Sequence, residues 1–137
     1  MLKVTADSNI YISALQFGGQ PLRLLELARA GAIDLAISEP IIAEVERVLR
    51  DKFNWPGEQV HEIEPRLAAF TRRVTPTETL DVVKDDPADN RILECAKAAG
   101  SEYVVTGDDD LLRLGKYVEI QIVKVSDFLQ RGQFQSR

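Results

Sequence analysis

Apolar and polar positions alternate along the chain in blocks that predict strands followed by helices. Short apolar runs rich in β-branched residues fit buried strands and occupy residues 2–6, 33–37, 103–106 and 120–125. Apolar residues at helical spacing predict helices at residues 10–15, 22–30, 40–50, 86–99, 108–112 and 126–129. Strands that alternate with helices are typical of right-handed βαβ crossovers. The pattern therefore predicts an α/β fold whose mainly parallel sheet is covered on both faces.

Capping and breaking residues place the ends of these helices. Ser38, Asp86 and Ser126 are expected N-caps, and Gly100 is expected to stop the helix that Asp86-Pro87 begins. Between residues 60 and 70 the spacing is helical, but Pro65 falls inside it and is expected to kink or split the helix. Residues 74–83 are expected to form a connection, with a short strand as one alternative.

Length and charge limit the kind of protein. The chain has 137 residues, which fits a single domain over residues 1–137. Its formal net charge is −5. An acidic balance argues against broad non-specific binding of nucleic acid, because affinity for a polyanion comes mainly from cationic contacts to phosphate. A nucleic-acid substrate stays possible if a bound metal neutralises several of the acids.

Cysteine usage and hydropathy indicate a cytoplasmic protein. Cys95 is the only cysteine, so neither an intrachain disulfide nor a cysteine-based zinc site is possible. A reducing cytoplasm is its simplest location. No apolar run approaches the roughly 20 residues that a membrane helix needs, so we expect no membrane association. Cys95 is expected in the core, His61 at the surface, and Phe53 with Trp55 in a packing cluster.

Two acidic clusters flank the predicted helix and strand between residues 86 and 106. Asp85, Asp86 and Asp89 precede or begin the helix, and Asp108, Asp109 and Asp110 follow the strand. Asp7 follows the first strand, and Glu44 lies near the start of the helix after the second strand. In parallel sheets functional groups gather at the carboxyl ends of the strands, so these acids meet at one edge if the first strand neighbours the strand at 103–106.

Converging carboxylates indicate a divalent metal, because without a cation they would repel one another and raise each other's pKa. Oxygen-only ligands favour a hard ion, Mg²⁺ or Mn²⁺. Such an ion supports phosphodiester hydrolysis. Taken singly, each acid also has an ordinary explanation: Asp7, Asp86 and Asp108 as helix caps, Asp89 beside a helix dipole, and Glu44 paired with Arg47. Their joint appearance favours the site.

Four ordered motifs resemble those of PIN-domain ribonucleases, and within that family the toxins of toxin–antitoxin pairs. The motifs are DSN at 7–9, SEPIIAEVERVL at 38–49, DDPADNRILECA at 85–96 and VTGDDDLL at 105–112. The resemblance implies a three-layer α/β/α sandwich that cleaves RNA with Mg²⁺ or Mn²⁺, leaving a 5′-phosphate and a 3′-hydroxyl. It also implies a homodimer and a cognate antitoxin protein.

The resemblance also implies roles for individual residues. The family's catalytic acids fall on Asp7, Glu44, Asp89 and Asp108. Among them Asp7, Asp89 and Asp108 hold the metal, whereas Glu44 positions or deprotonates the attacking water. The expected supporting residues are Asn9, Thr106 and, as a secondary candidate, Asp110, with Asp85 and Asp109 facing solvent.

Two other classes of protein fit parts of the pattern. A catalytically inactive PIN-like module would keep the fold and bind RNA or a partner without the reaction. A phosphate-accepting receiver-like domain also gathers acids at strand ends, but this chain lacks a well-placed lysine after a late strand. Metal-dependent cleavage of RNA would distinguish the ribonuclease from both of these alternatives.

Overall fold

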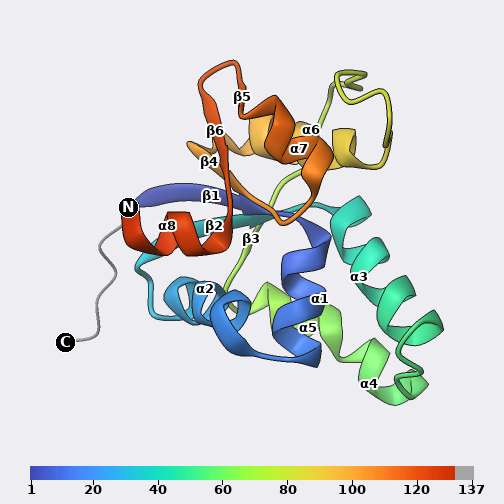
Figure 1. Ribbon diagram of the computed structural model, residues 1–137. Helices are drawn as coiled ribbons and strands as arrows, with labels where there is room; N and C mark the ends of the chain where they lie inside the picture. Colours follow the sequence, from blue (N-terminus) through green and yellow to red (C-terminus); the bar gives the residue numbers. More distant parts are fainter. Residues whose placement is uncertain (132–137) are drawn as a thin grey trace.

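The computed structural model describes residues 1–131 (Figure 1), so residues 132–137 of the domain expected over 1–137 lie outside it. Its centre is a sheet of six strands in the order β3-β2-β1-β4-β6-β5. The strands are β1 (Leu2–Ala6), β2 (Ile33–Ile37), β3 (Arg72–Arg73), β4 (Tyr103–Val105), β5 (Lys116–Tyr117) and β6 (Ile120–Val123). All neighbouring strands run parallel except β5 and β6. The predicted α/β fold with a mainly parallel sheet is confirmed.

Helices cover both faces of this sheet. They are α1 (Ser8–Gln16), α2 (Gly19–Arg29), α3 (Glu39–Asp51), α4 (Gly57–His61), α5 (Ile63–Ala68), α6 (Asp89–Ala99), α7 (Asp109–Leu114) and α8 (Val125–Arg131). In Figure 1, α6 and α7 lie above the sheet, whereas α1, α2, α5 and α8 lie below it. The three-layer α/β/α sandwich is therefore present. Within residues 1–131, no helix is both long and apolar enough to cross a bilayer.

The strand order places the carboxyl ends of β1 and β4 next to each other. β1 pairs with β2 on one side and with β4 on the other, with Ala6 opposite Val105. The chain therefore leaves β1 toward β2 and later returns to its other side, which makes the gap between β1 and β4 the point where strand order reverses. In open parallel sheets such a switch point is where binding sites form.

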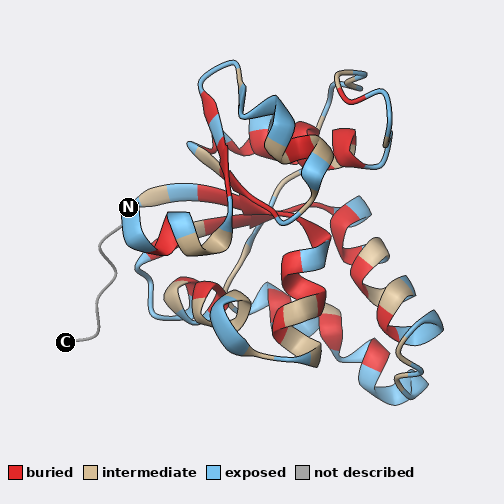
Figure 2. Cartoon of the chain, in the orientation of Figure 1, coloured by how far each residue is buried: buried red, intermediate tan, exposed pale blue. Residues whose placement is uncertain are grey.

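The central strands are buried on both faces, as parallel strands under two helical layers must be. Figure 2 shows the carboxyl-terminal parts of β1, β2 and β4 as the buried centre of the molecule, whereas the start of β1 is more exposed. Val4, Leu35 and Val104 are at most 1% exposed. Cys95 is buried and His61 is exposed, as predicted. The predicted packing of Phe53 and Trp55 is also confirmed, since both pack partly buried against the core.

Two helix starts differ from the sequence-based expectation, and one predicted N-cap residue lacks its side-chain hydrogen bond. The helix expected from Asp86 begins at Asp89, with Ala88 as its N-cap, because Asp86 instead closes a turn in which its Oδ1 accepts a hydrogen bond from the Ala88 N–H (3.3 Å). α8 begins before Ser126, which therefore does not cap it. Ser38 occupies the N-cap position of α3, but its side chain makes no capping hydrogen bond.

Pro65 splits its segment as predicted. The chain forms α4 and α5 in succession, and Pro65 is the third residue of α5, where a missing backbone N–H leaves no helical bond unmade. No strand forms in residues 74–83; β3 lies just before them and pairs with the end of β2. The two-residue strand β5 was not predicted, because its pairing with β6 depends on a tight hairpin rather than on an apolar run.

Candidate active site

Asp7 is fixed at the end of β1 by three hydrogen bonds. It is the N-cap of α1 and is only 3% exposed. Its Oδ1 accepts from the Asn9 N–H (3.3 Å) and the Ser8 hydroxyl (3.2 Å), and its Oδ2 accepts from the Thr106 hydroxyl (2.7 Å). Capping and site-building are therefore not alternatives for Asp7, because one oxygen caps the helix while the other faces β4.

Thr106 connects the ends of β1 and β4. Besides donating to Asp7, its Oγ1 accepts a hydrogen bond from the Asp108 N–H (3.0 Å). Asp108 in turn caps α7, since its Oδ1 accepts from the N–H groups of Asp110 (2.8 Å) and Leu111 (3.2 Å). The completely buried Thr106 therefore links the Asp7 carboxylate to the backbone at Asp108.

Asp108 also belongs to a group of four aspartates that converge at this edge of the sheet. Asp86, Asp89, Asp108 and Asp110 each offer a carboxylate oxygen, and these oxygens all lie within 4.8 Å of one another. They come from the loop before α6, the first turn of α6, the end of β4 and the first turn of α7. The predicted acids Asp89 and Asp108 are thus brought together with the secondary candidate Asp110.

A cleft of about 300 Å³ joins this group to the other predicted acids. Its lining consists of Asp7, Ser8, Asn9, Pro40, Ile41, Glu44, Arg47, Asp86, Ala88, Asp89, Arg91, Ile92 and Asp108. Asp7 and Glu44 lie outside the four-aspartate group but face the same cleft. All four acids expected from the sequence therefore line one cleft at the switch point of the sheet.

Asp89 carries the largest electrostatic perturbation in the cleft. Its pKa is raised to about 8, first by burial, then by a hydrogen bond to Asp108 and by the negative charges of Asp108, Asp86 and Asp7. The residue is 5% exposed, and its Oδ2 has no hydrogen-bond partner within residues 1–131. Asp89 is thus a buried acid that is held protonated at neutral pH for want of a positive partner.

Burial also raises the pKa of Asp7, and the charge of Asp108 adds to this effect. The hydrogen bonds from Thr106, Asn9 and Ser8 partly offset it, because they stabilise the carboxylate. The pKa of Asp7 is therefore raised against the effect of three hydrogen-bond donors, whereas the Oδ2 of Asp89 receives no such bond.

The donor set fits a hard divalent cation. All the convergent ligands are carboxylate oxygens, which Mg²⁺ and Mn²⁺ prefer over softer metals. An exposed acidic cluster alone would be weak support, since such clusters are common without a metal. Here one member, Asp89, is buried, and its Oδ2 has no hydrogen-bond partner within residues 1–131. A cation bound by the cluster would stabilise a carboxylate that has too few partners in the protein.

Of the remaining predicted residues, Glu44 and Asn9 line the cleft, whereas Asp110, Asp85 and Asp109 are not among its lining residues. Glu44 forms an ion pair with Arg47 and is about one-third exposed, so the pairing considered as its ordinary role is present together with its position in the cleft. Asp110 forms an ion pair with Arg113. Asn9 has an exposed side chain and reaches Asp7 through its backbone N–H. The exposure predicted for Asp85 and Asp109 is confirmed.

Asp86 is the member of the cluster that sequence reasoning missed. It was assigned to the helix start, because Asp followed by Pro is a common N-cap and N1 pair. The available signal was its spacing: Asp86 and Asp89 are three residues apart, which puts two carboxylates on the same side of a helical turn. The turn at Pro87-Ala88 keeps that proximity although the helix begins later.

An α/β/α sandwich with a partly buried acidic cluster at its switch point defines a class of protein suited to binding a divalent cation. Comparison with protein families identifies one family within this class. The family model for the PIN domain matches residues 3–110, which is most of the chain, and the protein belongs to the PIN-domain family. PIN domains are generally nucleases that use divalent metals. Comparison with curated proteins found no match.

Proposed function

We propose that the protein is an Mg²⁺- or Mn²⁺-dependent endoribonuclease that hydrolyses phosphodiester bonds of RNA. The observation that carries the proposal is Asp89, a buried member of the group of four aspartates, whose pKa is raised to about 8 and whose Oδ2 has no hydrogen-bond partner within residues 1–131. Membership of a family of nucleases supports the reaction class. The choice of RNA as substrate rests on the resemblance of the sequence motifs to PIN-domain ribonucleases.

Asp7, Asp89 and Asp108 are the residues proposed to hold the cation. When bound, it would neutralise their charge, polarise a phosphate and stabilise charge on the leaving oxygen. Thr106 links the Asp7 carboxylate to the backbone at Asp108 through its two hydrogen bonds. Their carboxylates therefore need little reorganisation to accept a ligand, which is the arrangement that preorganised sites use.

Glu44 and Arg47 supply complementary functions at the rim of the cleft. Glu44 is the proposed group that orients water and accepts its proton, since it lines the cleft without belonging to the four-aspartate group. Arg47 is more than half exposed and is one of two arginines that line the acidic cleft; the other, Arg91, forms an ion pair with Glu94. It is therefore placed to contact a phosphate of the substrate, as arginine commonly does.

Purified protein incubated with a panel of short RNAs tests the proposal. Cleavage is expected with Mg²⁺ or Mn²⁺ and not with excess chelator, and the products should have 5′-phosphates. Asp7→Asn and Asp89→Asn should abolish cleavage, whereas Asp109→Asn, which changes an exposed acid of the same sequence cluster, should not. Cleavage in chelator, or full activity of both site variants, would exclude the mechanism. RNA binding without cleavage or metal binding would support the inactive PIN-like module instead.

We further propose that the protein is the toxin of a toxin–antitoxin pair and acts in the cytoplasm as a homodimer. The motif resemblance supports these statements. Expression should arrest growth, Asp108→Asn should remove the arrest, and a protein encoded by the adjacent gene should relieve it. If wild type and Asp108→Asn are equally harmless, the toxin role fails, although ribonuclease activity can stand. Sedimentation of the purified protein tests the dimer.

A further inference from the structure

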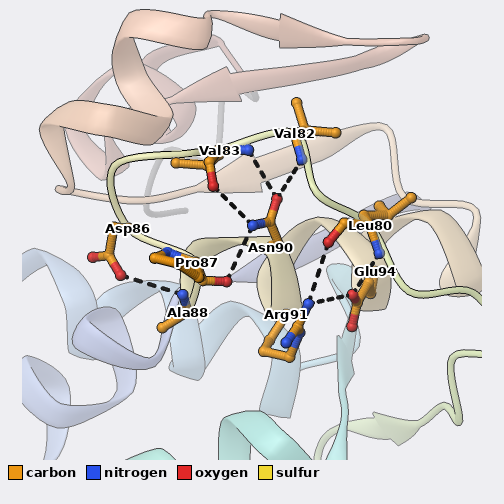
Figure 3. Close-up of polar contacts among 9 residues, drawn as sticks. All are labelled: Leu80, Val82, Val83, Asp86, Pro87, Ala88, Asn90, Arg91 and Glu94. Carbon is orange, nitrogen blue, oxygen red and sulfur yellow. Dashed lines mark hydrogen bonds and ion pairs between the residues drawn. The ribbon is translucent and has the colours of Figure 1, made fainter.

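Asn90, the residue after Asp89, uses its whole side-chain amide to hold the preceding loop (Figure 3). It is 1% exposed. Its Oδ1 accepts hydrogen bonds from the backbone N–H groups of Val82 (2.8 Å) and Val83 (2.9 Å). Its Nδ2 donates to the carbonyls of Val83 (2.9 Å) and Pro87 (3.2 Å). One buried side chain therefore bonds four backbone groups, three of which lie at Val82 and Val83 in a segment with neither helix nor strand.

These bonds close the loop that carries Asp86. Val83 lies at one end of the loop and Pro87 at the other, and Asn90 binds both. Within it, the Asp89 N–H donates to the Asp86 carbonyl (3.0 Å), so the backbone at Asp86 is also tied to the start of α6. The closed loop holds the Asp86 carboxylate in the group within 4.8 Å of Asp89, Asp108 and Asp110.

Electrostatics alone would move Asp86 out of this position. It is only partly buried, and the charge of its neighbours repels it when no cation is bound. The cationic side chain of the loop, Lys84, forms its ion pair with Asp81 (2.6 Å) instead. Arg91, which lines the same cleft, pairs with Glu94 (2.6 Å). The position of Asp86 in the cluster therefore depends on the backbone of the loop, and the side chain that fixes this backbone is Asn90.

We infer that Asp86 is an additional ligand of the metal site and that Asn90 is the residue that positions it. The inference rests on the proposed function in one respect, that the cluster binds a divalent cation. It extends that function by assigning a ligand outside the four acids expected from the sequence. It also assigns a positioning role to a residue that contacts neither metal nor substrate.

Calorimetric titration of the metal-free protein with Mn²⁺ tests this assignment without measuring activity. Asp86→Asn should weaken Mn²⁺ binding about tenfold, and Asn90→Ala should weaken it by a similar factor, in the range found when the partners of metal ligands are removed. Because Asn90 acts through Asp86, the double variant should bind Mn²⁺ no more weakly than Asp86→Asn alone. Such non-additivity is the signature of two residues in one pathway.

Glu94→Gln is the matched control. Glu94 also binds the segment that precedes α6, two residues before Val82. Its Oε2 accepts a hydrogen bond from the Leu80 N–H (2.8 Å) and pairs with Arg91 (2.6 Å). This variant should lower the melting temperature yet leave Mn²⁺ affinity within twofold of wild type. A role of Asn90 in folding alone would lower its melting temperature in the same way without weakening Mn²⁺ binding.

Several results would overturn the inference. Unchanged Mn²⁺ affinity in Asp86→Asn is decisive, because that variant keeps Asn90 and the loop bonds and does not depend on how Asn90→Ala folds. Losses in Asn90→Ala that add fully to those in Asp86→Asn would also refute it, since Asn90 would then act through Asp89. If wild type binds no Mn²⁺, the proposed metal site itself fails. If wild type binds but these variants bind equally well, only the positioning of Asp86 fails.

Discussion

Replacement of Asp89 by asparagine should stabilise the metal-free protein at neutral pH. Unfolded, this carboxyl ionises near its ordinary pKa of 3.8, whereas in the folded chain it keeps its proton until about pH 8. Between these values the folded chain binds one more proton than the unfolded chain, so the contribution to the free energy of unfolding falls as pH rises. This contribution of Asp89 to stability is fully present below pH 3.8 and is lost as pH rises through about 8. Asparagine keeps the shape and does not ionise.

The size of the effect follows from the same pKa difference. Each pKa unit corresponds to about 1.4 kcal/mol, so from about pH 5 to about pH 7 the carboxyl would lower the free energy of unfolding by about 3 kcal/mol. Water in the open cleft screens the charges, which reduces the expected difference between Asp89→Asn and wild type to about 1–2 kcal/mol. For a chain of this length that corresponds to about 5 °C in melting temperature.

Thermal and urea unfolding in chelator, measured at several pH values, checks this prediction. The stability of Asp89→Asn relative to wild type should increase steadily from acid to neutral pH. Asp109→Asn is the control, because Asp109 is exposed and should change stability by less than about 0.5 kcal/mol at every pH. A less stable Asp89→Asn protein at neutral pH, or a difference that does not grow with pH, would refute the electrostatic reasoning.

Three further changes test other parts of the site. Thr106→Val removes the hydrogen bonds to Asp7 and Asp108 at nearly constant volume, and it should lower the free energy of unfolding by about 1–3 kcal/mol in urea titrations and weaken Mn²⁺ binding. Arg47→Gln should raise KM for RNA more than it lowers kcat and reduce the salt dependence of binding, unlike Arg50→Gln, which changes a cation outside the residues that line the cleft. Mn²⁺ at about 100 times its dissociation constant should stabilise wild type by about 2.7 kcal/mol, and Asp89→Asn should lose this gain.

The sequence predicted that the two halves of the site meet on one condition, that the strands before Asp7 and Asp108 are neighbours. Asp7 follows an apolar strand and Asp108 follows another, and parallel strands place such residues at one edge once the strands are neighbours. The structure shows that β1 and β4 are neighbours, with Ala6 opposite Val105. The local pattern fixes which acids lie at strand ends. The neighbour relation itself depends on the whole strand order.

The features that the sequence did not predict depend on contacts between distant or irregular segments. Asp86 looks like a helix cap because Asp-Pro usually is one, whereas its place in the cluster depends on the turn before α6 and on the hydrogen bonds of Asn90 to the preceding loop. The two-residue strand β3 is similar, since Arg72 and Arg73 have no apolar pattern and are strand residues only because they pair with β2. Local propensity does not predict the conformation of residues whose structure depends on pairing with distant strands.

The arrangement of hydrogen bonds around the cleft explains why its acids differ in their need for a cation. Asp7 is as buried as Asp89, but three donors stabilise its carboxylate, so part of the cost of burying its charge is already offset by the protein. Asp89 has an unpartnered oxygen and three acidic neighbours, so its charge is favourable only when a cation is present. A metal should therefore displace a proton mainly from Asp89, and Mn²⁺ affinity should rise with pH up to about pH 8 in wild type. Proton release measured by calorimetry in buffers of different ionisation enthalpy checks this, and binding without proton release at neutral pH would place the cation away from Asp89.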